Sequence, residues 1–411
     1  MLFNSSYSII KFIKIFIRRL LPIIMPILWV FVGLNRLINL CFHLNSIQTD
    51  RNLLFIVQNS VAADYAKTIV DILKDNNKCK IFLTNDQIVN PYLTKQIIID
   101  IINLEYINIF ISLLKYWDLI IFVNHPWGLG IWFAPFIKKI YINHGICTGK
   151  VNNDKGEDGV YGPCRVIRPF NRPYYHKMFC SSKFEKKYAI LQNSKLRKRM
   201  VVTGFLKSDI IITLNKQREK IRTSLGFNDK DFLIHIISTW GNASLFQTIG
   251  EELLIEAAKL TDKYHFIFSL HPRHDEFGDL KNRRRKAVFD KYKKMGIQPQ
   301  DNVGWDNYVV ACDMAISDHS SLCLFYLLLE KPLLLVNIPQ NNYIKGSVFH
   351  QLCQIAPVLS TPKKLYSSIE NAKFEAKSGK LYEFGKSLID YPGTSAERYT
   401  EQIYRILNYE N

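Results

Sequence analysis

The sequence lacks the cysteine pattern of a disulfide scaffold or of a metal site. Its eight cysteines are scattered, no two form a C-x-x-C pair, and most lie among apolar residues. Such cysteines are typical of reduced core residues in a cytosolic protein. Carboxylates do not cluster at metal-ligand spacing either, so we predict no metal site and no bound cofactor, and magnesium is neither required nor excluded.

Acidic residues are few relative to basic ones. The chain has 36 Asp and Glu against 54 Lys and Arg, which gives a formal net charge of +18. An excess of this size predicts an anionic partner. Zinc-finger spacing, an RNA-recognition sequence and internal repeats are all missing, so nucleic acid is excluded as the expected partner. An anionic membrane surface and phosphate-rich substrates remain.

A long uninterrupted apolar run is also missing at the N-terminus. Residues 21–34 are uncharged but contain two prolines, and they are shorter than the ~20 residues that a spanning helix needs. A small-residue cleavage site does not follow, so a signal peptide is not expected. Together with the preceding basic residues, the run predicts a segment, 1–45, that lies in an anionic membrane surface. The alternative is a helix packed on the catalytic core. The basic residues are Lys11, Lys14, Arg18 and Arg19.

At 411 residues the chain is longer than one hydrophobic core usually supports. From residue 52 onward, strand-like and helix-like segments alternate, a pattern that predicts parallel sheets with crossover helices. A polar stretch, 209–231, interrupts the alternation. We therefore predict an α/β protein with two Rossmann-like domains, at 50–208 and 215–390, an interdomain cleft that binds the ligand, and a closing helix at 391–411.

The run 317–321, Ser-Asp-His-Ser-Ser, follows one apolar strand and precedes an apolar helical stretch. A strand, a tight turn and a helix start offer backbone N–H groups and hydroxyls to a phosphate. Asp318, Ser320 and Ser321 are the candidate ligands. The alternative is that Asp318 or Ser320 only caps the helix.

A second candidate phosphate site follows the strand 265–270. His271 and Arg273 come directly after it, on either side of a proline that ends the strand. Arginine suits bidentate contact with phosphate oxygens, and histidine can donate a further hydrogen bond. Together with the turn at 317–321, these residues predict a pyrophosphate cradle at two adjacent strand ends. For Arg273 the alternative is a surface salt bridge.

In the first half, His144 stands at the end of the strand 139–142 and before a glycine. Its ordinary pKa lies close to working pH, which suits a base that deprotonates an attacking hydroxyl. His144 is therefore the candidate catalytic base, and His125, at the end of another strand, is the alternative.

Two loops add further candidates. Lys207, in the stretch 203–209, is a candidate phosphate contact, unless that stretch is a simple turn into a linker. Ser238 and Thr239 open a hydroxyl-rich loop after the first strand of the second domain and are candidate donor ligands. The basic run 281–286 is typical of a solvated helix face, or it meets a polyanionic acceptor or lipid headgroups.

In this order the motifs resemble those of the CDP-glycerol glycerophosphotransferase family, which includes wall teichoic acid primases and polymerases and capsule polymerases. The motifs are His144-Gly145, Thr203-Gly204 with Asp209, His271-Pro272-Arg273, and the run 317–321 ahead of Glu330-Lys331-Pro332. The resemblance spans roughly residues 50–390 of this sequence.

The resemblance implies a GT-B arrangement and a peripheral position on the cytoplasmic face of the cell membrane. It implies transfer of glycerol phosphate, or a related polyol phosphate, from a CDP-activated donor to a hydroxyl of a membrane-linked acceptor, with release of CMP. His144 would be the catalytic base, and His271 is the second candidate catalytic residue. His271, Arg273, Ser320 and Ser321 would hold the donor pyrophosphate.

The chain departs from the family pattern at several positions. Ile146-Cys147 stands where the family usually has Thr-Pro, and His319 where it usually has tyrosine. The donor polyol is therefore open. Two alternatives to the phosphotransferase are a GT-B glycosyltransferase that uses a nucleotide sugar and a non-catalytic membrane-bound scaffold.

Overall fold

The structure, a computed structural model, divides the chain into two compact units. Unit 1 comprises Met1–His144, Arg165–Met178 and Thr400–Asn411, and unit 2 comprises Gly145–Cys164 and Phe179–Tyr399. The described residues are 26–34, 51–57, 60–74, 79–85, 104–124, 133, 136–143, 145–151, 158–168, 172–239, 241, 243–271, 290–300, 304–337 and 343–407.

The first half of the chain forms a seven-stranded sheet with the order β3-β2-β1-β4-β5-β8-β9. All of β4 and the last five residues of β1 are apolar and buried, as in α/β proteins whose sheets are covered on both faces. Within it β1 pairs in parallel with β2 and β4, and β4 with β5. The strands are β1 (Arg51–Val57), β2 (Cys79–Asn85), β3 (Glu105–Tyr106), β4 (Leu119–Val123), β5 (Lys138–Ile142), β8 (Lys177–Cys180) and β9 (Met200–Val202).

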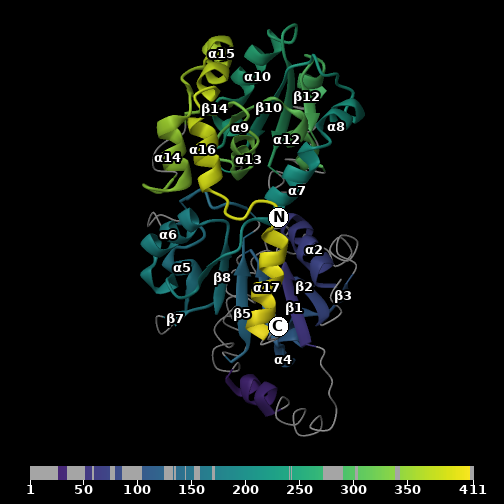
Figure 1. Ribbon diagram of the computed structural model, residues 1–411, viewed down its shortest axis with the longest axis vertical. Coiled ribbons are helices and arrows are strands. Elements are labelled where there is room, and N and C mark those ends of the chain that lie inside the picture. The colour runs from purple at the N-terminus through teal and green to yellow at the C-terminus, as the bar shows by residue number, and fades with distance from the viewer. Residues whose placement is uncertain are drawn as a thin grey trace, which may run out of the picture. The chain divides into compact units, whose positions relative to one another are not determined.

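Helix α2 (Ser60–Lys74) packs on β1, β2 and β4 (Figure 1). Its buried side recurs every three or four residues, from Ala62 through Ala66 and Ile69 to Leu73, so one face of the helix covers the sheet. Helix α4 (Ile109–Leu114) is followed by Trp117, whose indole is fully buried and donates to the carbonyl of Ser112 at 2.8 Å.

Unit 2 contains a six-stranded sheet with the order β12-β11-β10-β13-β14-β15, in which every pairing is parallel. From β10 the chain adds β11 and β12 on one side, and it then crosses to β13 on the other side of β10. This is the doubly wound pattern, and its strand order reverses between β10 and β13. The strands are β10 (Leu233–Ser238), β11 (His265–Leu270), β12 (Gln298–Gln300), β13 (Met314–Ser317), β14 (Leu333–Val336) and β15 (Val358–Leu359).

Helices pack around this sheet (Figure 1). They are α7 (Leu206–Asn215), α8 (Arg218–Ser224), α9 (Leu245–Thr248), α10 (Gly250–Ala258), α12 (Trp305–Ala311), α13 (Leu324–Leu328), α14 (Val348–Ile355), α15 (Leu365–Ala376) and α16 (Lys380–Ser387). Two further helices are α6 (Lys183–Gln192), which contacts β9 of the seven-stranded sheet, and α17 (Ser395–Leu407). The last of these begins in unit 2 and ends in unit 1.

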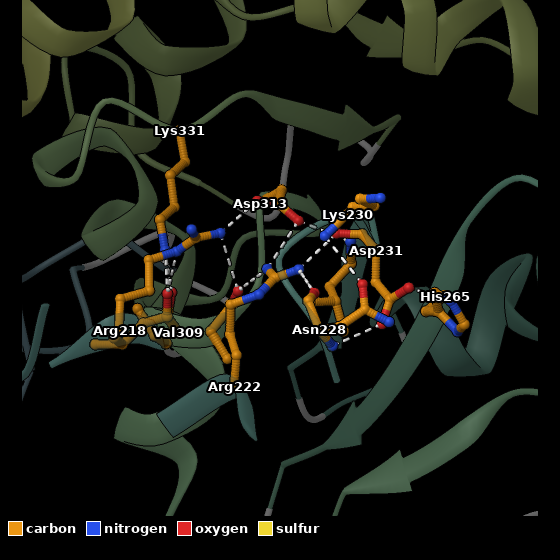
Figure 2. Close-up of polar contacts among 12 residues, drawn as sticks. Arg218, Arg222, Asn228, Lys230, Asp231, His265, Val309, Asp313 and Lys331 are labelled. Atoms are coloured by element: carbon orange, nitrogen blue, oxygen red, sulfur yellow. Dashed lines mark hydrogen bonds and ion pairs between the residues drawn. The ribbon is translucent and has the colours of Figure 1, made fainter. Parts of the chain in front are cut away.

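Three cationic side chains meet the carboxyl end of α12, opposite the end of the sheet where the strands finish (Figure 2). Lys331 donates to two carbonyl oxygens near the end of the helix, at 2.8 and 2.6 Å. Arg218 and Arg222 both contact the carboxylate of Asp313, Arg222 at 3.1 Å. That carboxylate also accepts the N–H of Leu233 at the start of β10, at 2.8 Å. The cluster satisfies helix carbonyls that would otherwise lack partners, and it joins α8, α12 and β10.

The predicted α/β class with two parallel sheets is confirmed, and the predicted strands 139–142 and 265–270 lie within one residue of β5 and β11. The prediction that the stretch 209–231 interrupts the alternation is wrong, because most of this stretch is helical, in α7 and α8. Lys, Arg and Glu favour helices, and a short buried side that includes Ile211 and Ile221 holds them to the unit.

The two units divide the chain differently from the predicted ranges of 50–208 and 215–390. Residues 145–164 belong to unit 2. The reason is a set of backbone contacts: Lys150 pairs with Tyr343 in an antiparallel bridge, and Phe349 N donates to Thr148 O at 3.2 Å. Hydrogen bonds between residues nearly 200 positions apart have no local signal in the sequence.

Of the predicted membrane segment 1–45, the structure describes a helix at residues 26–34. Four large apolar side chains on it are exposed: Ile27 by 58%, Val30 by 61%, Phe31 by 62% and Leu34 by 48%. Among the described residues, none of the helices has the length and apolar content needed to cross a membrane.

Candidate functional site

Three strands of unit 2 end side by side and bring the predicted donor ligands together. In the parallel register, Ser238 at the end of β10 pairs with Leu270 of β11, and Ile237 pairs with Ser317 of β13. The residues that follow these strands therefore leave the sheet at one edge. His271 is half-buried there, and its N–H donates to the carbonyl of Ser238 at 3.1 Å.

Asp318 joins two of these strand ends through the backbone. Its carboxylate accepts the N–H of Thr239 at 2.8 Å and the N–H of Leu245, at the start of α9, also at 2.8 Å. The side chain is fully buried, and this desolvation raises the pKa of its carboxyl group to about 6. This geometry gives Asp318 a positioning role. It fixes the loop between β10 and α9.

The hydroxyls near this edge have local partners too. Ser238 Oγ accepts the N–H of Phe246 at 2.9 Å. Ser320 is the N-cap of the short helix that leads into α13 and accepts the N–H of Leu322 at 3.4 Å. A hydroxyl that accepts one hydrogen bond still has a proton to donate and a second lone pair. Capping and phosphate contact are therefore compatible at Ser320, and the donor contact stays a prediction.

The chain segment 145–150 runs along the same edge of the sheet. At one end of it, a methyl group added at Gly145 would lie 3.3 Å from Oγ of Ser321, so the backbone passes close to this serine. At the other end, the ammonium group of Lys150 lies 3.9 Å from the position of a Cβ on Gly241, in the loop after β10. Lys150 was not among the predicted site residues.

Two buried carboxylates anchor the chain that follows this segment. Asp158 accepts two backbone N–H groups, at 2.7 and 2.6 Å, and the hydroxyl of Tyr188 at 2.7 Å. Glu185, in α6, accepts the hydroxyl of Tyr161 at 2.7 Å, and Ser181 donates to it through both its N–H and its Oγ. Burial raises the pKa of both carboxyl groups. All these partners belong to unit 2, so the hydrogen bonds hold residues 158–161 within that unit.

His319 is buried beside the turn, with 3% of its surface exposed. Neither ring nitrogen has a hydrogen-bond partner among the described residues. Its ring meets that of Phe349 edge to face, with centroids 5.8 Å apart. Burial, with a smaller contribution from the charge of Lys150, lowers the pKa of His319 to about 3, so the imidazole is neutral.

The predicted motif at 203–209 is mostly structural. Gly204 has a φ of +79°, and a Cβ there would lie 2.4 Å from Oγ of Ser395. Asp209 accepts the N–H of Ser395 at 2.8 Å and so holds the start of α17. Lys207 is nearly buried and pairs with Asp306 at 3.5 Å. Its contact with a phosphate stays a prediction.

Three of the predicted site residues lie outside the described residues: His144, His125 and Arg273. Their roles stay predictions. Within the described part of the chain, His, Cys, Asp and Glu do not gather in any group of three or more that could hold a metal ion.

The chemistry of the described edge suits a phosphate group. It combines a cation, Lys150, with the hydroxyls of Ser320 and Ser321 and with a neutral histidine, His319. These groups can hold phosphoryl oxygens and stabilise added negative charge. A base that would activate a nucleophile has to come from elsewhere, because the pKa of His319 is too low for that role at neutral pH.

A family model described as CDP-Glycerol:Poly(glycerophosphate) glycerophosphotransferase matches residues 38–405. Among characterised proteins, the sequence is similar to a teichoic acid poly(ribitol-phosphate) polymerase of Bacillus spizizenii. The two are 23% identical over 292 residues, which cover 66% of this chain and 45% of the relative. The chain thus spans about half the length of the curated relative that it matches.

Solved structures of similar fold include the wall teichoic acid polymerase TagF. Its TM-score is 0.60 at 12% identity, and the match covers 86% of this chain and 89% of that one. The S. aureus MnaA-UDP co-structure has a TM-score of 0.59 at 12% identity, with 88% and 98% covered. At these identities the likeness concerns the fold.

Proposed function

Because the chain belongs to the CDP-glycerol:poly(glycerophosphate) glycerophosphotransferase family, whose model matches residues 38–405, we propose that it is a phosphotransferase of wall polymer synthesis. It moves glycerol phosphate, or a related polyol phosphate, from a CDP-activated donor to a hydroxyl of a lipid-linked acceptor. CMP is the second product. The observation that carries this proposal is the edge where β10, β11 and β13 end, near which Lys150, the hydroxyls of Ser320 and Ser321, and His319 lie.

In the proposed reaction, the acceptor oxygen attacks the β-phosphorus of the donor. A new P–O bond forms, the bond from that phosphorus to the bridging oxygen breaks, and CMP leaves with the bonding electrons. His144 takes the proton of the attacking hydroxyl. His144 is the residue before Gly145, and Gly145 lies against Ser321. The ordinary pKa of a histidine lies close to working pH, which suits this role.

The donor is held at its phosphates by Arg273, Ser320 and Ser321 in this proposal, and by His271 at the end of β11. Ser238 and Thr239 line the neighbouring strand end. Asp318 contributes indirectly, because its carboxylate fixes the backbone of Thr239. Charge that develops on the β-phosphate in the transition state would meet hydrogen-bond donors already in place.

We also propose that the protein binds the cytoplasmic face of the cell membrane peripherally. The exposed residues Ile27, Val30, Phe31 and Leu34 recur at helical spacing and form one apolar face. Basic residues precede them in the sequence, at positions 11–19. An apolar face next to positive charge suits a surface of anionic lipid, where a lipid-linked acceptor is found.

The test uses the purified full-length protein with CDP-glycerol or CDP-ribitol and a lipid-linked acceptor in vesicles. The expected result is acceptor-dependent release of CMP, with transfer of the polyol phosphate to the acceptor. His144→Ala should lower the rate at least about 100-fold, the usual size of a general-base contribution. Release of UDP or CMP from nucleotide sugars alone would contradict the proposal. An unchanged rate in His144→Ala would contradict the assignment of the base.

A further inference from the structure

Lys150 reaches the phosphate-binding edge from a distant part of the chain. Its backbone is held by the bridge to Tyr343 and by Gly159, whose N–H donates to the carbonyl of Lys150 at 2.9 Å. Its ammonium group lies beside the loop after β10 and is close enough to Asp318 and His319 to shift the pKa of both. The side chain is half-buried, so its charge is only partly screened by water.

His319 supplies the second observation. A buried polar atom without a hydrogen-bond partner costs about 1–3 kcal/mol, so native proteins rarely leave one unsatisfied. His319 has two such atoms, Nδ1 and Nε2, in a side chain that is 97% buried. A neutral imidazole has one N–H to donate and one nitrogen that accepts. The N–H of His319 therefore has no acceptor among the described residues.

We propose that Lys150 and His319 together form the subsite for the second phosphate of the nucleoside diphosphate donor, with Lys150 supplying charge and His319 an N–H. This rests on the proposed function only in that the donor contains a diphosphate. The subsite lies at the reversal of strand order between β10 and β13, where ligands of doubly wound sheets bind.

A purely structural role for Lys150, as counterion of Asp318, explains less. The carboxylate of Asp318 already accepts two backbone N–H groups at 2.8 Å, and the pKa of Asp318 remains raised, to about 6, with Lys150 present. A counterion for Asp318 would also leave the ring nitrogens of His319 without partners. A phosphate would accept from the imidazole and would carry charge opposite to the ammonium group.

The experiment compares nucleotides with two phosphates and with one, by isothermal titration of the full-length protein with CDP, CMP, UDP and UMP. Lys150→Met should weaken binding of the diphosphate about 10- to 100-fold, the range for a charge-assisted hydrogen bond, and change binding of the monophosphate less than about twofold. Lys377→Met removes an exposed lysine of α15's C-cap and should change neither.

Two substitutions of His319 test whether its side chain donates a hydrogen bond or only fills space. His319→Phe removes both nitrogens and should weaken diphosphate binding about 10-fold. His319→Asn keeps an N–H donor and should recover part of that loss. If His319 only filled space, the Phe and Asn variants would bind the diphosphate equally well. If Lys150→Met does not fold, as judged by circular dichroism, Lys150→Gln takes its place in the same comparison.

The outcomes separate this inference from the proposed function. If the Lys150 and His319 variants lose equal affinity for the diphosphate and the monophosphate, or lose affinity for neither, the proposed subsite is wrong. A wild-type protein that prefers UDP and does not turn over a CDP-polyol would overturn the proposed function. The UDP-to-UMP comparison would then still decide the subsite. A wild-type protein that binds none of the four nucleotides would overturn both.

Discussion

Protonation of Asp318 should stabilise unit 2, which is unusual for an aspartate. Most folded proteins lower the pKa of a hydrogen-bonded aspartate, but burial raises that of Asp318 from 3.8 to about 6. The folded state therefore binds this proton more tightly than the unfolded state does. At about 1.4 kcal/mol per pKa unit, the ionised form lowers the free energy of unfolding by about 3 kcal/mol relative to the protonated form.

The direction of the pH dependence follows from this difference. Between pH 3.8 and pH 6 the folded state carries the proton and the unfolded state does not, so stability falls as the pH rises through this window. The contribution is fully present below pH 3.8 and lost above pH 6. About 2 kcal/mol of the change falls between pH 4 and pH 7. Solvent screening does not reduce it, because the side chain is fully buried.

Asp318→Asn removes this titration while it keeps the size of the side chain. We expect the free energy of unfolding of the variant to rise relative to wild type by about 2 kcal/mol between pH 4 and pH 7. Urea unfolding followed by pulse proteolysis measures both proteins at each pH. Other buried carboxyls, such as Asp158 and Glu185, titrate equally in both and cancel in the difference. Parallel pH profiles for the two proteins, or a difference that moves the other way, would refute the argument.

Three further outcomes are expected. Gly204→Ala should lower the free energy of unfolding by about 1–3 kcal/mol in urea unfolding, because φ is +79° and a Cβ would lie 2.4 Å from Ser395 Oγ. Gly226→Ala is the control: its φ is +83° but the space around it is open, so it should lose only the free energy due to backbone strain. Trp117→Ala should cost about 3–5 kcal/mol in the same assay through loss of a fully buried ring, and a change under about 1 kcal/mol would contradict its place in the core. The double change Val30→Ser and Phe31→Ser should weaken sedimentation with anionic vesicles at least about 10-fold without changing CDP binding, and unchanged sedimentation would refute the proposed membrane face.

The fold could be predicted from the sequence because its signals are local. The strand 265–270 is a short, mostly apolar run shortly before a proline, and its ends were predicted to the residue. Unit boundaries were harder. The path of residues 145–164 into unit 2 depends on partners such as Tyr343 and Glu185, which are far away in the sequence. The two buried carboxylates in this region could not be predicted from the pattern of apolar residues, because that pattern marks only apolar side chains as buried.

The candidate site was predicted in part. The strand-end rule placed Thr239, His271 and Asp318 at one edge correctly, because parallel strands end together. The rule does not say which atom of each residue faces a ligand, and Asp318 proved to be occupied by backbone N–H groups. Lys150, which we propose as a ligand of the second phosphate, was not predicted because it follows no strand and carries no motif. A lysine six residues after the candidate base His144 was the only available signal.

Loss of activity alone would not identify the donor ligands in this site. Several of the motif residues organise backbone: Asp318 fixes the loop after β10, Ser238 accepts from Phe246, and Asp209 holds the start of α17. Substituting any of them would displace neighbouring groups, so a lower turnover would not by itself show contact with the donor. A residue that binds the second phosphate has a narrower signature, because its removal weakens the diphosphate and spares the monophosphate. By that criterion Lys150 and His319 should separate from Asp318 and Asp209, whose substitution should weaken CDP and CMP together.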